Sequence, residues 1–583
     1  MPDDRLELAA ALDLVEGLRR ACRTGHLLNL AVGVPDAQLD AAQGGTWPAP
    51  RRLPAELVRQ VLLDPDLHSD PRGLMLRGVA LTGVLDLHAV NLPCPLTLRL
   101  CHLEQPPNLA NATVPALSLQ GCHLPGLLLD GVRVDGGAFC EQLTATGQVR
   151  ASGAHIAGQL DLRGATLTNP DGDALTLDGA RIDAGAFCYQ LTATGQVRAV
   201  RAHITGQLGL RGATLTNPDG NALTLDGARI DGAAFLDQLT ATGQVRAVRT
   251  QIAGQLNLQG ATLTNPDRDA LTLDGARIGD AFFVQLTTTG QLQAPGAQIT
   301  GQLNLRGATL TNPDGNALRL ERTQVGLLIF DDALVVKGTL NLIRAQIGDL
   351  VTGDRPPSPL LAPGWRVEDL HGGLRTDRKA AARWLASAPR FVAQPWHELA
   401  QVYDRNGQPA DARFLRLSAA QKTTTHAPWW SKPPRWGYGL LVGYGYLPLL
   451  AGAWLLAALL CAYLITSTQT SSFLPGNPAA LQSALAASSA ASNTRAAAPP
   501  GTPAASSVTG ATPCGQLRGS YPCLRPLLYS LDVVLPPTVS TGQSTAWRPT
   551  QDWIAYALTG LKTFGWLLTA LLIAGVTGLL RKT

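Results

Sequence analysis

The chain has 583 residues, with 60 glycines, 15% charged residues and only 5% aromatic residues. This composition is unusual for a compact enzyme and is typical of a repetitive solenoid joined to membrane spans. The formal net charge of +4 is small for this length, and no basic run is interleaved with aromatic residues, so we expect no nucleic-acid partner. The N-terminus, with Asp3 and Asp4 before Arg5, lacks the basic and then apolar order of a signal peptide.

Two amphipathic segments open the chain and predict helices. Apolar residues form one helical stripe between Arg5 and Arg23, and residues 54–63 predict a second helix. We expect residues 1–70 to form a helical cap over the open first coil of a solenoid, because an uncovered coil would leave its backbone and core exposed.

A 48-residue repeat fills the middle of the chain. Full units begin at positions 158, 206, 254 and 301, and a partial copy precedes them from Asp130. Within a unit, apolar residues come in pairs two apart, as at Leu160 and Leu162, which is the period of a strand. The turn sequence NPDG at 169–172 interrupts the strands, so we expect a loop protruding from every second coil.

Short strands at this regular spacing predict a mainly β fold for residues 71–350, a parallel β-helix with two coils in each unit. Each coil buries its inward residues and needs a neighbour on either side to satisfy its backbone hydrogen bonds. A β-propeller is the less favoured alternative, because a blade needs longer antiparallel strands with hairpin signals.

The spacing of small and apolar residues resembles that of the pentapeptide-repeat proteins. In that family a central Leu or Phe recurs every five residues, with a small residue two positions before it. Ala165-Thr-Leu167 and Ala180-Arg-Ile182 match this pattern, whereas the NPDG insertion departs from the strict period. The resemblance is to a degenerate member and implies a right-handed, square β-helix.

The cysteines point to no metal or redox site. None of the nine lies in a CxxC pair. Cys101-His102 recurs as Cys122-His123, a spacing that fits one coil and would stack like residues on each other. Because neighbours on a strand point to opposite faces, inward cysteines leave the histidines outward, and the four share no metal.

Two other motifs fall short of known chemistry. The glycines of GYGLLVG at 437–443 have the wrong spacing for a dinucleotide-binding turn and open an apolar segment. The helix HELAQ at 397–401 lacks the second histidine of a zinc-protease motif. We therefore predict no catalytic, cofactor-binding or metal-binding residue and no cofactor.

The chain changes character after position 350. Residues 351–376 are Pro-rich and predict a linker, and residues 377–425 predict a helical hairpin with a turn at Asn406-Gly407. Residues 437–466 and 553–580 are long and apolar enough to cross a bilayer. Tryptophans lie before the first segment and at the start of the second, where interfacial aromatics belong. We predict two C-terminal transmembrane helices.

Basic residues set the predicted orientation of these helices. Lys422, Lys432 and Arg435 precede the first span, and Arg581 and Lys582 follow the second. The positive-inside rule then places both termini and the solenoid in the cytoplasm. We expect a multi-pass protein of the bacterial inner membrane.

Residues 467–550 form the predicted external loop. Most of it is rich in Ala, Ser, Pro and Thr and predicts disorder, but a short apolar segment follows at 526–537. Cys514 and Cys523 lie on the outer side, where an oxidising compartment would let them form a disulfide. Asp532 and Lys562 are each costly near hydrocarbon, so we single them out as an interfacial pair. Alternatively, Lys562 snorkels to the interface while Asp532 stays hydrated.

A second resemblance covers most of the chain. PLLYSLDVVLPP at 526–537, GYGLLVGYGYLPL at 437–449 and RGLMLRGVALTGVLDL at 72–87 are similar to bacterial membrane-anchored repeat proteins, some of which are labelled membrane-associated oxidoreductases. That label implies an enzyme but names no mechanism.

Three functions are compatible with these features. The favoured one is a non-catalytic scaffold, held on the bilayer and binding an unidentified protein partner. The second is an oligomeric pore or transport-linked protein, because span, outer loop, short helix and span is the layout of a two-helix channel subunit. The third is the oxidoreductase implied by the family label.

Overall fold

The computed structural model describes residues 3–447, 449–479, 482, 521–537 and 540–577. The chain divides into two compact units, a solenoid unit (residues 1–415) and a C-terminal unit (residues 416–583), and each is described by itself.

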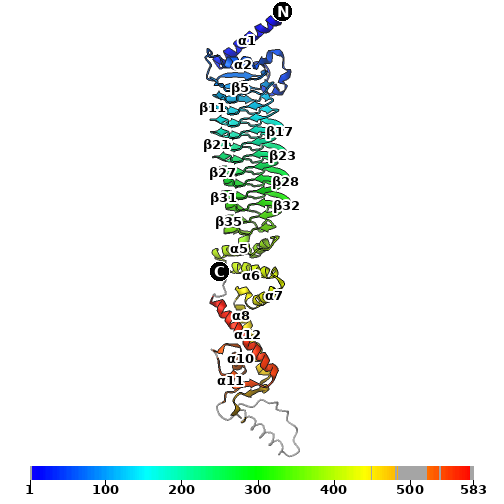
Figure 1. Ribbon diagram of the computed structural model, residues 1–583, viewed down its shortest axis with the longest axis vertical. Coiled ribbons are helices and arrows are strands. Elements are labelled where there is room, and N and C mark those ends of the chain that lie inside the picture. The colour runs from blue at the N-terminus through cyan, green and yellow to red at the C-terminus, as the bar shows by residue number, and fades with distance from the viewer. Residues whose placement is uncertain (1–2, 448, 480–481, 483–520, 538–539, 578–583) are drawn as a thin grey trace, which may run out of the picture. The chain divides into compact units, whose positions relative to one another are not determined.

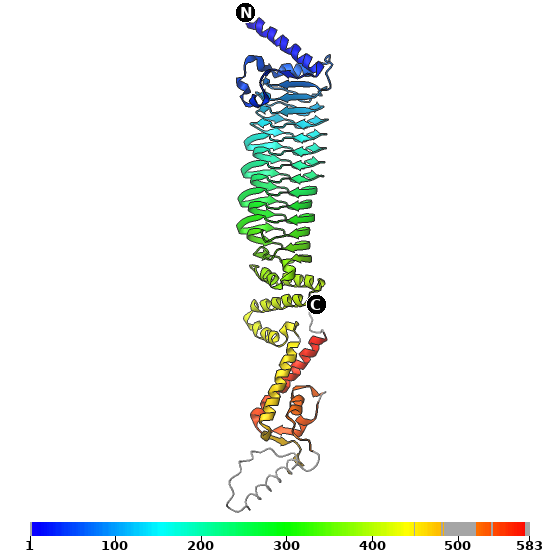
Figure 2. The same cartoon turned by 180° about the vertical axis from the view of Figure 1, so that it is seen from behind.

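The solenoid unit contains a parallel β-solenoid of about 14 turns, which confirms the predicted fold class (Figures 1 and 2). Its strands belong to two long sheets, one of 21 and one of 16 strands. The first sheet contains β1 (Leu28–Asn29), β3 (Leu74–Arg77), β5 (Leu96–Arg99), β7 (Thr113–Val114), β8 (Leu117–Gln120), β11 (Arg133–Val134), β12 (Ala138–Phe139), β15 (His155–Ile156), β16 (Leu160–Asp161), β18 (Arg181–Ile182), β19 (Ala186–Phe187), β21 (His203–Ile204), β22 (Leu208–Gly209), β24 (Arg229–Ile230), β25 (Ala234–Phe235), β27 (Gln251–Asn257), β29 (Arg277–Phe282), β31 (Gln298–Asn304), β33 (Gln324–Ile329), β35 (Gln346–Thr352) and β37 (Arg366–Gly372). The second contains β2 (Arg52–Pro54), β4 (Ala80–Thr82), β6 (His102–Leu103), β9 (His123–Leu124), β10 (Leu127–Leu128), β13 (Thr144–Ala145), β14 (Val149–Arg150), β17 (Thr166–Thr176), β20 (Thr192–Arg198), β23 (Thr214–Thr224), β26 (Thr240–Arg246), β28 (Thr262–Thr272), β30 (Thr287–Gln293), β32 (Thr309–Arg319), β34 (Val335–Asn341) and β36 (Leu360–Leu361).

The strand register explains the 48-residue repeat. His155 pairs with Arg181, and Arg181 pairs with His203, so successive coils lie 26 and 22 residues apart and each unit forms two coils. Inward residues such as Ile182 and Ile204 are buried in every coil and form one continuous core. The pairing is parallel, whereas a propeller blade would be antiparallel.

The longer coil of each unit contains the NPDG sequence, which reads NPDR at 265–268 in the third unit, and the predicted loop is present there. Between Thr168 and Asp173 the strand β17 leaves the register of β20, and Asn169 closes the excursion by donating a hydrogen bond to the carbonyl oxygen of Asp173 at 2.8 Å. The next coil accommodates it at Gly195, whose φ is 106°. A Cβ atom there would lie 2.2 Å from the Asn169 carbonyl oxygen, so only glycine fits.

The N-terminal segment contains the two predicted helices, α1 (Asp3–Thr24) and α2 (Ala55–Leu62). It is more than a helical cap, however, because β1 pairs with β3 and β2 pairs with β4. The solenoid therefore begins inside residues 1–70. Strands of two or three residues are too short for their alternation to be recognised from sequence.

The predicted linker at 351–376 is wrong, because the solenoid continues through it. Leu360 on β36 pairs with Leu340, and Val367 on β37 pairs with Ile347. Prolines 356, 357 and 359 precede β36 and so leave its hydrogen bonds intact. The helices α3 (Gly373–Thr376), α4 (Arg378–Ala386), α5 (Gln394–Arg405) and α6 (Pro409–Thr425) follow, where the helical hairpin was predicted.

The C-terminal unit contains α7 (Lys432–Val442), α8 (Leu449–Thr468), α10 (Pro526–Val534), α11 (Gln543–Ala546) and α12 (Asp552–Val576). Within it, β38 (Phe473–Pro475) pairs antiparallel with β39 (Trp547–Pro549). Residues 449–468 and 552–574 are long and apolar enough to cross a membrane. The first predicted span, 437–466, is not one helix, because Gly443 and Tyr444 both adopt φ near 57° and end α7.

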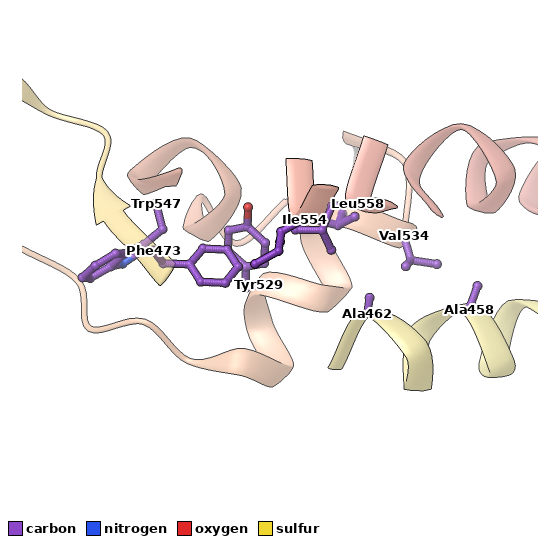
Figure 3. Packing of buried hydrophobic residues seen from close by; sticks show 9 residues of the cluster. Ala458, Ala462, Phe473, Tyr529, Val534, Trp547, Ile554 and Leu558 are labelled. Atoms are coloured by element: carbon purple, nitrogen blue, oxygen red, sulfur yellow. The ribbon is translucent and has the colours of Figure 1, made fainter. Parts of the chain in front are cut away.

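Two chain segments distant in sequence form the core of this unit. Ala458 and Ala462 on α8 face Ile554 and Leu558 on α12, and Val534 on α10 completes the cluster (Figure 3). Phe473, Tyr529 and Trp547 extend the cluster toward the β38–β39 pair. The short apolar segment predicted at 526–537 is thus a helix packed against both long helices.

Candidate functional site

A groove of about 520 Å³ lies on the first sheet at the C-terminal end of the solenoid. One wall is a ladder of long polar side chains in register on neighbouring strands. Its members are Gln298, Gln324, Gln346 and Arg366. Two positions further along these strands, Gly326 and Gly348 leave a low floor because they have no side chains. The groove therefore crosses the strands and follows the direction in which the coils stack.

Helix α5 closes the end of the groove and caps the last coil. Arg405 donates hydrogen bonds to the carbonyl oxygens of Val367 and Glu368 at 2.7 and 2.8 Å, and Glu398 accepts one from the Val367 N–H at 3.3 Å. Strand β37 would otherwise expose unpaired backbone groups, so α5 fixes the last edge of the solenoid while adding both charged residues to the groove.

A cluster of two carboxylates and one imidazole lies beside the groove on β35 and β37. Asp349 and Asp369 are direct partners in the parallel register, and His371 follows two residues after Asp369. The His371 Nε2 atom lies 3.5 Å from Asp349 Oδ1 and 3.6 Å from Asp369 Oδ2. All three side chains remain partly exposed, and their ligand atoms lie within 4.8 Å of one another.

The cluster is held in place by groups around it. Asp369 Oδ1 accepts hydrogen bonds from Asn406 Nδ2 and from the Leu370 N–H, both at 2.7 Å. The Asn406 bond is the main reason that the pKa of Asp369 is lowered from its ordinary value. On the other side of the cluster, Arg375 Nη1 lies 3.5 Å from His371 Nδ1. Asp369 therefore stays ionised, with its Oδ2 atom free to face His371.

The repeated Cys-His pairs adopt the expected arrangement. Cys101 and Cys122 are fully buried, and the rings of His102 and His123 stack on the outside with centroids 5.3 Å apart and planes within 5°. His102 Nδ1 lies 3.0 Å from the carbonyl oxygen of Ala41, so an N-terminal segment covers this ladder. The thiols and imidazoles point to opposite sides of the strand and do not converge on one point.

The remaining repeat cysteines are buried and inert. Burial raises the pKa of both Cys140 and Cys188 to about 12, so neither thiol ionises at neutral pH. A further pair of cysteines has no sequence signal: Cys22 on α1 and Cys94, far apart along the chain, place their Sγ atoms 4.0 Å apart in the interior.

A second polar ladder follows the other sheet, and one of its positions differs from the rest. In three successive copies an Asp accepts one hydrogen bond from an Arg and one from a backbone N–H. These sets are Asp130 with Arg150 and Ser152, Asp178 with Arg198 and Val200, and Asp226 with Arg246 and Val248. In the next copy, Gln293 stands in place of the Arg and Pro295 in place of the residue that donates its backbone N–H. The buried Oδ1 atom of Asp274 has no hydrogen-bond partner. Burial raises the pKa of Asp274 and also that of Asp269, which accepts a hydrogen bond from Gln293.

Asp532 and Lys562, the two residues singled out in the C-terminal unit, have separate partners. The Asp532 carboxylate accepts hydrogen bonds from the backbone N–H groups of Thr541 and Ser544. Burial acts to raise the pKa of Asp532, but these donated hydrogen bonds outweigh it and the pKa is lowered. The Lys562 ammonium lies 5.2 Å from the ring centroid of Trp566. In the described part of this unit no ion pair joins Asp532 to Lys562.

Other sequence features end without a site. Cys514 lies outside the described residues, so its predicted disulfide with Cys523 stays a prediction. Residues 437–442 of the glycine motif lie inside α7, not in a turn between strand and helix. The helix of the HELAQ motif is α5, whose Glu398 bonds the solenoid backbone.

The search of protein-family models finds no match to this chain, and neither curated proteins nor solved structures show a similar protein.

Proposed function

We propose that this protein is a membrane-anchored, non-catalytic scaffold that binds an extended segment of a protein partner in the groove of its solenoid. The supporting observation is the shape and lining of the groove. It is open and elongated, and its wall of glutamine amides both donates and accepts hydrogen bonds. An extended polypeptide offers the same alternation of donors and acceptors along its length, whereas an open groove excludes too little water for most catalytic chemistry.

The proposed anchor is a pair of membrane-spanning helices. Two helices of sufficient length and hydropathy support a spanning hairpin, α8 and α12. Lys422, Lys432 and Arg435 before α8 and Arg581 and Lys582 after α12 favour both termini in the cytoplasm, with the solenoid on that side of a bacterial inner membrane.

Site-specific photo-crosslinking in native membranes tests the groove. A photoreactive phenylalanine analogue in place of Gln346 should crosslink one protein, and the same analogue in place of Gln251 should not. Gln251 is the matched control, because it is exposed on the same ladder, two coils before Gln298 and outside the groove. Identical products from both positions, or none from Gln346, would contradict the proposal.

A pore is the second candidate function, and the packing of α10 favours it. This short helix contacts both long helices, and Trp566 Nε1 donates a hydrogen bond to the Leu535 carbonyl oxygen at 3.1 Å, so an otherwise unsatisfied helix end is paired where water is scarce. Short helices packed between two spans line selectivity filters in channels.

Ion flux decides between the two candidates. Full-length protein in liposomes should pass K⁺ if α10 lines a pore. Lys562→Gln should raise that flux at least threefold, because it removes the positive charge over Trp566, the residue that bonds the end of α10. Flux no greater than that of protein-free liposomes would leave the scaffold as the only function proposed.

A further inference from the structure

We propose that Asp349, Asp369 and His371 form a binding site for a divalent first-row transition metal of the zinc class. The site is independent of the proposed scaffold function, because it requires only the last two coils and the turn after α5. Its three ligand atoms come from neighbouring strands whose register is fixed by backbone hydrogen bonds.

The distances distinguish this cluster from ordinary His–Asp pairs in the same solenoid. His155 and His203 lie 2.8 and 2.9 Å from Asp183 and Asp231, which is hydrogen-bonding distance. His371 Nε2 instead lies 3.5 and 3.6 Å from two carboxylates at once. Two ligands of a tetrahedral zinc ion, each about 2.1 Å from the metal, lie about 3.4 Å apart.

Charge supports the same conclusion. Two aspartates directly opposite each other on adjacent strands repel, and this arrangement needs a positive group between them. In the solenoid's other acidic ladder an arginine supplies that group, as Arg198 does for Asp178. Among the described residues no Lys or Arg forms an ion pair with Asp349 or Asp369. The group that faces both carboxylates is the His371 imidazole, which is a metal ligand when it is neutral.

The surroundings also resemble those of a metal ligand. The Asn406 amide holds Asp369 through Oδ1 and leaves Oδ2 facing His371, and such outer hydrogen bonds orient ligands in metal sites. One imidazole and two carboxylates suit zinc, cobalt or manganese better than calcium, which prefers oxygen alone. With three protein ligands, at least one coordination position stays open.

Arg375 is the opposing group. Its guanidinium lies 3.5 Å from His371 Nδ1 and adds a positive charge beside the bound cation. Removing this charge should therefore strengthen metal binding, whereas removing any ligand should weaken it. A purely structural role for the cluster would not produce opposite effects from these neighbouring residues.

Metal titration of the full chain tests the site. Untagged protein in detergent, freed of metal by a chelator, should bind one Zn²⁺ that His371→Ala or Asp349→Ala weakens at least tenfold and Arg375→Gln strengthens about threefold. His203→Ala is the matched control and should leave the affinity unchanged. Co²⁺ in place of Zn²⁺ should give visible d–d absorption without the near-ultraviolet band of a cobalt–thiolate bond. Failure of the wild type to bind, equal binding by His371→Ala, or a thiolate band would overturn the proposal.

Discussion

Asp532→Ala is expected to destabilise the C-terminal unit by about 3 kcal/mol, because two backbone donors lose a charged acceptor at once. Asp532 is 8% exposed, and its carboxylate connects α10 to the N–H groups of Thr541 and Ser544, which come after this helix in the chain. Without it, these N–H groups have no partner of equal strength. A fall in the melting temperature of the full chain in detergent, followed by tryptophan fluorescence, would measure the effect.

The stability that Asp532 contributes should depend on pH. The pKa of Asp532 is lowered in the folded protein, so its contribution is complete above the unfolded value of about 3.9 and is lost as the pH falls through the folded value. The difference between wild type and Asp532→Ala should therefore be constant between pH 6 and 8 and shrink below pH 4.

Lys562→Ala is the informative control for this variant. Its ammonium contacts only the face of Trp566 among the contacts described, which is worth about 1 kcal/mol or less at an exposed site. Because the two residues have separate partners, the double variant should lose the sum of the two single losses. A coupling energy above about 1 kcal/mol would show that Asp532 and Lys562 interact, as the sequence alone suggested, and would contradict their having separate partners.

The repeat made the solenoid predictable, and interruptions of the repeat explain most of the errors. Apolar pairs such as Leu160 and Leu162 recur with fixed spacing, so strands, coils and the NPDG loops follow from period and turn chemistry alone. The prolines at 356–359 looked like a linker because composition does not show that β36 resumes the ladder immediately after them. The break at Gly443 could not be predicted, because an apolar run indicates the length of a segment and not its backbone conformation.

Only part of the candidate site could be predicted from the sequence. Asp349 and Asp369 are 20 residues apart, which is close to one coil, but the sequence after position 350 has no repeat that would indicate the coil length there. His371 lies two residues after Asp369 and so shares its face of the strand, but Asn406 could not be connected to them, because α3, α4 and α5 lie between it and β37. Cys22 and Cys94 have no shared period at all, so only three-dimensional packing brings them together.

The largest expected effect in the solenoid comes from moving the defect at Asp274 to a regular copy. Arg246→Gln with Val248→Pro gives Asp226 the surroundings of Asp274, because both donors to its carboxylate are removed. Proline is compatible with this position, since Pro295 occupies the equivalent place. We expect a loss of about 2 kcal/mol at pH 7, measured as a lower urea midpoint by far-ultraviolet circular dichroism.

The sign of the pH dependence separates this mechanism from a simple loss of contacts. The pKa of Asp274 is raised by burial, and Asp226 in the variant should behave in the same way. A carboxyl with a raised folded pKa is harmless below its unfolded value, because it is protonated in both states, and it destabilises the fold as the pH rises through the folded value. The loss should therefore be clearly smaller at pH 4 than at pH 7, and an equal loss at pH 4 and pH 7 would contradict the explanation.

The reverse substitution, made beside Asp274, should stabilise the solenoid, and by less than the double substitution destabilises it. Gln293→Arg restores a cation that can reach Asp274 and Asp269, as Arg198 reaches Asp178 and Asp173 in the first unit. Arg319, however, pairs directly with position 293 on the next strand, where the regular units have threonine, and two arginines in register repel. We expect a gain of about 1 kcal/mol at pH 7 and a smaller gain at pH 4. In the last unit the arginine of this ladder is therefore Arg319, one coil further along the solenoid than the position of Gln293. The Asp274 carboxyl lacks the arginine that its counterparts in the earlier copies have.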